Sequence, residues 1–279
     1  MDAFDRTSWQ SQLKAQIADT ADCCVQRVVI VDTTPSTMDA AVVCAQDEQN
    51  SAQGVLVVAG SQTSGRGQHG RAWTDHDHCT LPCTFALQGP DIDPPMLAAL
   101  CACAVHESIE QLLQSFGITI KDRLLIKWPN DIVVRSDING RTNDRKLAGI
   151  LIEQKQELTL IGVGINCTQT QEHWGEELMG NAVSLRMLGV EIPNDELRIR
   201  LMCIVIDRLS QWLDAKDPSA IRERYQANDA MVGTHRRFMH NRVLYAGTVE
   251  SIDPLTQIAV RTDEGVENLP IAQTSHARE

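Results

Sequence analysis

Positive charge is scarce in this chain. Its 279 residues include 25 Lys and Arg against 37 Asp and Glu, which gives a formal net charge of −12. Nucleic acids and anionic membranes both favour a basic protein face, so this charge argues against either of them as the main partner. The sequence also lacks an apolar run that approaches the length of a membrane-spanning helix, and we predict no transmembrane segment.

We also expect no signal peptide, and this bears on the nine cysteines of the chain. The cysteines are scattered through segments with strand-like or helix-like patterns, and we expect reduced thiols in the core of a cytoplasmic protein. The length suits one large domain plus a small one, and 43% hydrophobic residues is ordinary for a soluble globular protein.

No metal site is predicted. One cluster has side chains of the zinc-ligand type: His76, His78, Cys79 and Cys83. However, adjacent ligands such as His78 and Cys79 rarely bind one zinc ion together. Alternation around Cys83 also predicts the inward face of a strand, so we expect core packing here.

Against this acidic background, one glycine-rich segment concentrates positive charge. Residues 62–73 read QTSGRGQHGRAW and directly follow the apolar run at 54–59. Glycines let main-chain N–H groups turn toward an anion, and Arg66 and Arg71 add fixed charge. The segment predicts a phosphate or carboxylate site, although a solvated loop remains an alternative from this segment alone.

Two familiar phosphate-binding loops do not fit the segment. Gly65, Gly67 and Gly70 match the dinucleotide fingerprint, but residues 74–82 lack the helical period that must follow it. Gly60 and Gly65 have Walker spacing, yet Arg-Gly stands where Lys-Ser/Thr is needed. Both readings are therefore rejected.

Four further features place polar or charged residues at or near strand ends. A Lys-Trp-Pro-Asn-Asp turn at 127–131 separates two apolar runs, and Lys146 stands at the mouth of a strand that contains Gly149. A glycine-bearing strand at 161–167 carries Asn166, and the strand at 28–31 leads toward Ser36 and Thr37 before a helix.

In this order and spacing, the motifs resemble the biotin protein ligases, also called biotin–[acetyl-CoA-carboxylase] ligases. The resemblance runs from about Val28 to the C-terminus. It implies an α/β (α+β) fold: a mixed-sheet catalytic domain like that of class II aminoacyl-tRNA synthetases (1–228) and a small SH3-like barrel (229–279). It also implies that biotin and ATP, with Mg²⁺, form biotinyl-5′-AMP, and that biotin then passes to a lysine of a biotin carboxyl carrier protein.

The resemblance also implies roles for individual residues. Positive charge for catalysis would come from Lys146, Arg66, Lys127 and Arg71, with Lys146 bridging the biotin carboxyl group and the phosphate. Biotin would be bound by Ser36, Thr37, Gln62, Gly65, Arg66, Gly67, Lys146 and Gly149. ATP would be bound by Arg66, Trp73, Lys127, Asn130 and Asn166, with Trp73 packing on adenine. Trp128 is expected in the core, and Asp131 as a turn former.

The remaining pattern predicts the elements between these motifs. Helices are expected at 4–17, 37–49, 93–116, about twenty residues from 194, and 219–227, with a polar hairpin loop at 136–144. Pro82 predicts a bulge or an edge in its strand. After about Asp229, short strands are expected at 242–245, 247–252 and 257–261.

Three other functions stay open. A lipoate or octanoate ligase or transferase of the same fold is the nearest, and a non-catalytic biotin or nucleotide sensor is the second. The third is a DNA-binding repressor, which the acidic charge opposes. The first strand begins near Val28, which leaves too little chain ahead of it for a winged helix-turn-helix. A homodimer is possible, but no interface can be named.

Overall fold

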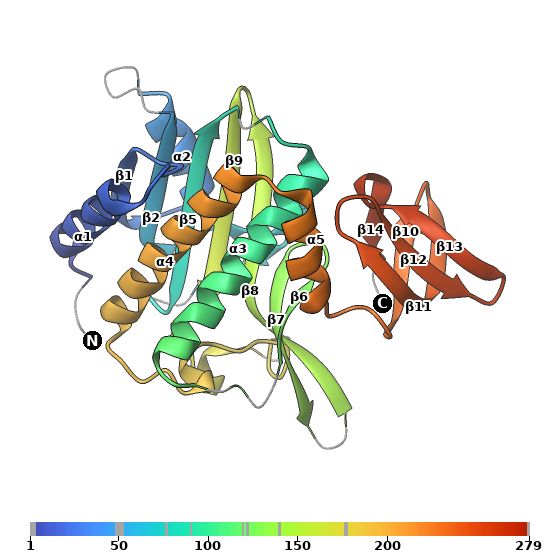
Figure 1. Cartoon of the computed structure of the whole chain (residues 1–279). Helices are drawn as coiled ribbons and strands as arrows, with labels where there is room; N and C mark the ends of the chain where they lie inside the picture. Colours follow the sequence, from blue (N-terminus) through green and yellow to red (C-terminus); the bar gives the residue numbers. More distant parts are fainter. Residues whose placement is uncertain are drawn as a thin grey trace.

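The computed structural model describes residues 4–47, 53–75, 78–89, 91–118, 120, 123–138, 141–175 and 178–277. A seven-stranded mixed sheet forms the centre of the molecule (Figure 1). In sheet order its strands are β1 (Arg27–Thr34), β2 (Gly54–Gln62), β5 (Thr80–Gln88), β9 (Leu158–Asn166), β8 (Arg141–Lys155), β7 (Asp131–Ile138) and β6 (Arg123–Lys127). The β1–β2 pair is parallel and the other neighbours are antiparallel.

Helices cover both faces of this sheet because its central strands alternate apolar residues to either side. Leu56 and Val58 of β2 join the larger core, while Val55 and Val57 join a separate core under α2. The helices are α1 (Arg6–Asp19), α2 (Thr37–Ala45), α3 (Pro94–Ser115), α4 (Asn194–Ala215) and α5 (Pro218–Ala227). All five were predicted, and α2 ends earlier than expected.

One helix corrects the prediction about membrane spans. By length and composition, α3 could cross a membrane, with a mean hydropathy of 1.3 in its most apolar window. However, 72% of that window is buried inside the protein. Its apolar residues therefore pack into the core, and the helix lies beside α4 on one face of the sheet (Figure 1). The helix follows Asp93 and ends before Gly117, whose positive φ of 64° suits glycine.

The hairpin predicted at 136–144 is present, but the prediction of a loop over all of these residues was wrong. β7 continues to Ile138 and β8 begins at Arg141, so the two strands form a longer hairpin, and residues 139–140 lie outside the described part. The polar residues of this segment do not prevent strand pairing, because an antiparallel hairpin can have its faces in solvent. Lys146 consequently lies inside β8 rather than at its mouth.

Pro82 was expected to cause a bulge or to mark an edge of its strand. It causes no bulge. β5 pairs with β9 in continuous register from Thr80 to Gln88, and Pro82 lies opposite Gly164. The ladder with β2 runs only from Cys83 to Leu87. Pro82 therefore stands just beyond that ladder, where its missing N–H group removes no bond to β2.

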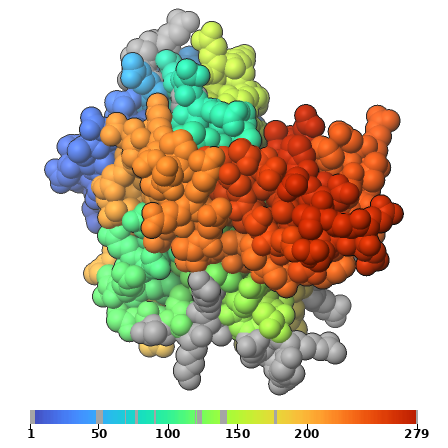
Figure 2. Space-filling view, turned by 45° about the vertical axis from the view of Figure 1, so that its right-hand side comes forward, coloured from blue at the N-terminus to red at the C-terminus, as the bar shows by residue number. Residues whose placement is uncertain are grey.

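A second, five-stranded antiparallel sheet follows α5. In sheet order its strands are β13 (Gly265–Pro270), β12 (Gln257–Thr262), β11 (Val243–Asp253), β10 (His235–His240) and β14 (Thr274–His276). Two predicted strands are one continuous strand, β11, and β10, β13 and β14 were not predicted. The sheet packs beside α5 to give a continuous surface (Figure 2), where Arg222 pairs with Asp253 at 3.0 Å. The predicted fold class, a mixed α/β domain followed by a small antiparallel sheet, is confirmed.

Candidate functional site

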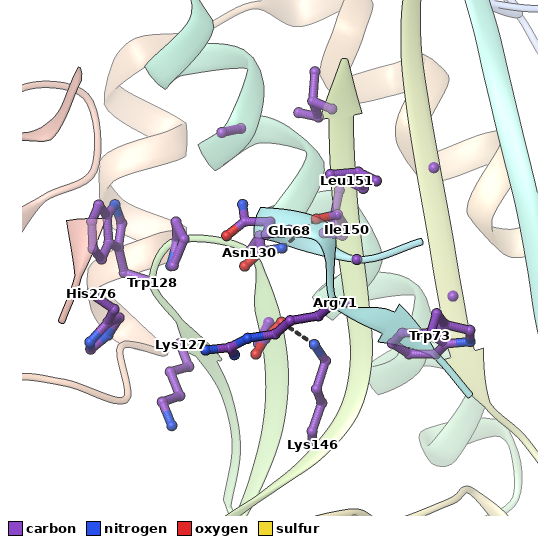
Figure 3. A pocket seen from close by; sticks show the side chains of 18 of the residues that line it. Gln68, Arg71, Trp73, Lys127, Trp128, Asn130, Lys146, Ile150, Leu151 and His276 are labelled. Atoms are coloured by element: carbon purple, nitrogen blue, oxygen red, sulfur yellow. Dashed lines mark hydrogen bonds and ion pairs between the residues drawn. The ribbon is translucent and has the colours of Figure 1, made fainter. Parts of the chain in front are cut away.

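A cavity of about 1270 Å³ opens between the seven-stranded sheet and the second sheet (Figure 3). Nearly all of the predicted site residues line it, although they come from segments far apart in the sequence. The lining includes Ser36, Thr37, Gln62, Arg66, Gly67, Arg71, Trp73, Lys127, Asn130, Lys146, Gly149 and Asn166. Gly65 is the one predicted residue outside this lining among those described.

The glycine-rich segment folds into a small hairpin over the cavity. Its strands are β3 (Gly65–Arg66) and β4 (Ala72–Trp73), and the Gly67 N–H group donates to the Arg71 carbonyl at 2.8 Å. Gly65 is needed for close approach, since a Cβ atom there would lie 2.8 Å from the Trp73 carbonyl oxygen. The hairpin thus holds Arg66, Arg71 and Trp73 at the cavity as one unit.

Arg66 has an acidic partner at the surface of α2. Its guanidinium donates to both carboxylate oxygens of Asp39, at 2.6 and 3.0 Å. The hydrogen bond and charge of Arg66 lower the pKa of Asp39. Because the arginine side chain is 38% exposed, solvent screens this pair. An incoming anion can therefore compete with Asp39 for Arg66.

Lys146 lies beside a break in the β7–β8 register. Val133 pairs with Lys146 and Ile132 pairs with Ala148, so Leu147 is an extra residue. This bulge places the Lys146 ammonium group 2.7 Å from a carboxylate oxygen of Asp131 and 5.4 Å from the centre of a Trp73 ring (Figure 3). Asp131, expected as a turn former, starts β7 and is also the ion-pair partner of Lys146.

Lys127 precedes the turn that joins β6 to β7. The Trp128–Pro129 peptide bond in this turn is cis. Burial lowers the pKa of Lys127, and the positive charge of Arg236 on β10 lowers it further. Trp128 is buried, as expected, and packs 6.0 Å from the Phe238 ring. Lys127 therefore stands at the junction of the two sheets, where additional negative charge would be stabilised.

Trp73 covers two glycines that face each other on adjacent strands. Gly149 of β8 pairs with Gly164 of β9. A Cβ atom at Gly164 would lie 2.7 Å from two indole carbons of Trp73, and one at Gly149 would lie 3.0 Å from the same side chain. In this structure Gly149 makes room for Trp73 and Lys146, in addition to any room it leaves for a ligand.

The two asparagines predicted to bond adenine already donate hydrogen bonds to main-chain carbonyl groups of the protein. Asn166 donates its amide hydrogens to the carbonyl oxygens of Lys146 and Val183, at 3.2 and 3.1 Å. Asn130 donates to the Ile150 carbonyl at 2.5 Å. The amide hydrogens of Asn166 are thus already used, and bonding to adenine would require its oxygen or an exchange of partners.

The polar end of the cavity is formed by the start of α2 and the end of β2. Ser36 caps α2 by accepting a hydrogen bond from the Met38 N–H group at 3.2 Å. The Gln62 side-chain oxygen accepts from both the N–H group and the hydroxyl of Thr37, at 2.8 and 3.0 Å. These residues form a rigid network that can recognise a polar ring.

Several lining residues were not identified from the sequence. Arg236 and His276 come from β10 and β14, two strands without a clear alternating pattern, and Trp174 comes from an irregular segment after β9. Burial, together with Lys127 and Arg236, lowers the pKa of His276 to about 4. Met38, beside the predicted Ser-Thr pair, also lines the cavity. A Cβ atom at Gly162 would lie 2.7 Å from its sulfur.

The side chains considered as zinc ligands make contacts that differ from those of a zinc site. His78 stacks on Phe4 with ring centres 5.6 Å apart, the Cys79 sulfur lies 4.0 Å from His173 Nε2, and Cys83 is buried in β5. His76 lies outside the described residues. Within the described part, no group of three or more His, Cys, Asp or Glu side chains could hold a metal ion.

Comparison with known proteins gives consistent similarities. Residues 30–169 match the model of the biotin/lipoate A/B protein ligase family. The chain is 31% identical over 185 residues to a biotin–[acetyl-CoA-carboxylase] ligase from Mycobacterium tuberculosis, a match that covers 66% of this chain and 64% of that relative. It is 28% identical over 252 residues to the bifunctional ligase/repressor BirA of Bacillus subtilis, covering 88% and 72%.

Solved structures show the same fold. A biotin protein ligase from Aquifex aeolicus in complex with biotin and ATP superposes with a TM-score of 0.71 at 21% identity, covering 91% of this chain and all of that one. The family match spans helix α2, which carries Thr37, and the strands that carry Gln62, Lys146 and Asn166. This chain therefore belongs to the biotin/lipoate A/B protein ligase family.

Proposed function

We propose that this protein activates biotin with ATP and transfers it to a lysine of a biotin carboxyl carrier protein. In the first step, a biotin carboxylate oxygen attacks the α-phosphorus of ATP and pyrophosphate leaves. In the second step, the carrier amine attacks the acyl carbon of biotinyl-5′-AMP and AMP leaves. The observation that carries the proposal is one cavity with a hydrogen-bonding end at Ser36, Thr37 and Gln62 and a cationic region around Lys146.

The cationic region offsets the repulsion between the biotin carboxylate and the ATP phosphates in the first step. Two negative charges 4 Å apart repel by about 1 kcal/mol in water but by about 4 kcal/mol in a partly dry site. Lys146 bridges the carboxylate and the α-phosphate, Arg66 contacts the same group, and Lys127 and Arg71 stabilise the remaining phosphates. ATP binds as its Mg²⁺ complex, and the ion supplies further positive charge at the phosphates.

Ligand binding requires an exchange of partners at two of these cations. Asp39 pairs with Arg66 and Asp131 pairs with Lys146 in the structure. The anionic ligand replaces these carboxylates, because each pair is partly exposed and its net stabilisation is only about 0–1 kcal/mol. No covalent enzyme intermediate is needed, so the chemistry requires positioned charge rather than a nucleophilic side chain.

The remaining residues determine which ligand binds where. Ser36, Thr37, Gln62 and the main chain around Gly65 and Gly67 hold the ureido ring, and Gly149 leaves space for the biotin tail. The Trp73 ring stacks on adenine, and Asn130 and Asn166 bond its edge. A buried ureido group left unpaired would cost about 1–3 kcal/mol, so each of these bonds contributes to selectivity.

The names of the relatives support a carrier protein as the second substrate. The relatives include biotin–[acetyl-CoA-carboxylase] ligases, whose names link biotin to a carboxylase. The protein acts in the cytoplasm as a catalytic domain (1–228) followed by a small barrel-like domain (229–279), and neither nucleic acid nor membrane is a partner. Whether it forms a homodimer is tested by its mass in solution.

The proposal is tested with a carrier domain. The protein is incubated with biotin, ATP, Mg²⁺ and the carrier, and the carrier is analysed by mass spectrometry. We expect a biotin-sized mass gain on one lysine, and a loss of about a hundredfold or more in rate for Lys146→Ala. Lys14→Ala, which removes an exposed lysine of α1, is the matched control and should retain the wild-type rate. A wild-type protein that leaves the carrier unmodified would contradict the proposal.

A lipoate or octanoate ligase is the second candidate, because the family includes ligases for both biotin and lipoate. An ATP–pyrophosphate exchange assay with biotin, lipoate or octanoate distinguishes them. Exchange that depends on octanoate or lipoate but not on biotin would favour this candidate. Binding of biotin without any pyrophosphate exchange would instead indicate a sensor.

A further inference from the structure

A buried hydroxyl group stands directly behind the polar end of the cavity. Thr84 lies on β5 and is 0% exposed. Its hydroxyl oxygen lies 2.9 Å from the hydroxyl oxygen of Thr37, which lines the cavity. Thr84 is not among the described residues that line the cavity, so it can influence a ligand only through Thr37.

The direction of every hydrogen bond in this network follows from one main-chain group. The Thr37 N–H group can only donate, so the atom of Gln62 that it meets at 2.8 Å must be the amide oxygen. The Thr37 hydroxyl lies 3.0 Å from the same oxygen, which has no hydrogen, so this hydroxyl must also donate to it. The hydrogen of Thr37 is thereby used, and Thr84 must donate to Thr37.

This order of donors fixes the orientation of the Gln62 amide. With its oxygen held by two donors from Thr37, its nitrogen points the other way and lies beside the hairpin, 3.1 Å from where a Cβ atom of Gly65 would be. The Gln62 main chain is also held, because its N–H group donates to Asp75 at 2.7 Å. Two amide hydrogens therefore remain to meet a ligand.

We infer that Thr84 is a positioning residue that makes this end of the cavity selective for a ring bearing a carbonyl acceptor. The inference rests on the proposed function and refines its substrate. The ureido ring of biotin offers such a carbonyl, whereas the dithiolane ring of lipoate and the chain end of octanoate do not. Without the Thr84 hydroxyl, Thr37 loses a donor and is free to turn its own hydrogen away from Gln62, which leaves the amide oxygen held by one donor, the Thr37 N–H group, instead of two.

Thr84→Val tests this inference because valine keeps the shape of threonine but has no hydroxyl. In the ATP–pyrophosphate exchange assay we expect the KM for biotin to rise about tenfold, the loss of about one hydrogen bond, with kcat and the KM for ATP unchanged. Thr84→Ser should restore the KM. Dethiobiotin, which keeps the ureido ring, should show the same rise, and any weak exchange with octanoate should not change.

Thr159→Val is the matched control. Thr159 is 1% exposed on β9, and its hydroxyl donates to the side chain of Gln154 at 3.0 Å, at the opposite end of the strand from Asn166. This variant also removes a buried hydroxyl, and it should leave the KM for biotin unchanged. If Thr84→Val is too unstable to assay, Thr84→Ala, which avoids the second branched methyl group, repeats the comparison.

The outcomes separate the inference from the proposed function. A wild-type protein without biotin-dependent exchange overturns the proposed function. A wild-type protein with normal exchange whose Thr84→Val variant has an unchanged KM for biotin overturns only the inference. A rise in KM that serine does not restore, or an equal rise for octanoate, also overturns it, because either result would indicate a packing effect rather than hydrogen bonding.

Discussion

At the scale of single residues, the site depends on small side chains as much as on charged ones. Gly149 and Gly164 leave a flat surface on which the Trp73 indole rests. The ring is attached to the hairpin through β4, so the glycines also determine how closely the hairpin approaches the sheet. A methyl group at either position would therefore displace Trp73, the ring proposed to stack on adenine.

Gly164→Ala tests this arrangement. The added methyl group would lie 2.7 Å from two ring carbons of Trp73, so the ring must move. Such overpacking costs about 1–3 kcal/mol. We expect the KM for ATP to rise about tenfold and the KM for biotin to change little, as measured by pyrophosphate exchange.

Gly175→Ala is the control for this experiment. A Cβ atom at Gly175 would have no neighbour within 4 Å among the described residues, and the variant should behave as the wild type. Equal kinetic constants for Gly164→Ala and the wild type would mean that Trp73 does not contact the nucleotide.

Four cations that line the cavity, Arg66, Arg71, Lys127 and Lys146, could be predicted from sequence, but Arg236 and the acidic partners could not. Arg66 and Lys146 stand in recognisable motifs, while Asp39 and Asp131 were not expected to bind them. The first pair depends on how α2 lies beside the hairpin, and the second on a bulge between β7 and β8. Both are tertiary features that a linear pattern does not contain.

At the scale of elements, sequence patterns predicted all five α-helices of the described residues, and each of these helices buries apolar side chains. Apolar periodicity failed where a strand has polar residues on both faces. β10 reads His-Arg-Arg-Phe-Met-His and was missed, although Phe238 is fully buried. The β7–β8 hairpin was shortened for the same reason, since its outer half is polar.

The central helix α3 gives the fold a dependence on pH. His106 is fully buried on this helix, and its ring nitrogens meet the Leu124 carbonyl and the Arg224 guanidinium at 3.2 and 3.0 Å. A guanidinium can only donate, so the ring is neutral. Burial is the main cause that lowers the pKa of His106 to about 4, from 6.5.

A lowered histidine pKa stabilises the fold above the unfolded pKa, and this stability is lost as the pH falls toward the folded pKa. We expect His106 to contribute a loss of about 2 kcal/mol in the free energy of unfolding between pH 7 and pH 5. Urea denaturation at both pH values measures this loss. His106→Gln should reduce the pH dependence, whereas His235→Gln, at an exposed position on β10, should not. An unchanged pH dependence in His106→Gln would contradict the assignment.

At the scale of the whole molecule, the cavity is shared between two sheets. The larger sheet, together with the start of α2 and the β3–β4 hairpin, supplies the predicted residues, and the smaller sheet supplies Arg236 and His276. The Trp128 ring connects them, with ring centres 6.0 Å from Phe238 and 5.6 Å from His276. The second sheet is therefore part of the wall of the site.

Arg236→Ala tests whether this wall takes part in ATP binding. Arg236 donates to Asp144 at 3.2 Å and its charge acts on Lys127. We expect the KM for ATP to rise about tenfold at low salt, where cation–phosphate attraction is least screened, with the KM for biotin unchanged.

Arg261→Ala removes an exposed arginine from the same sheet and should have little effect, because surface ion pairs contribute about 0–1 kcal/mol. If Arg236→Ala and Arg261→Ala give the same KM for ATP, then the second sheet makes no charge contact with the nucleotide.

The path of the last residues has a practical consequence. β14 is the outermost strand of the second sheet, and Ala277, just beyond it, still lines the cavity. An affinity tag that began directly after Ala277 would therefore start beside the cavity. A tag that began directly before α1 would start at the opposite edge of the large sheet, beside β1 (Figure 1). Purification tags for kinetic work are best attached at that end.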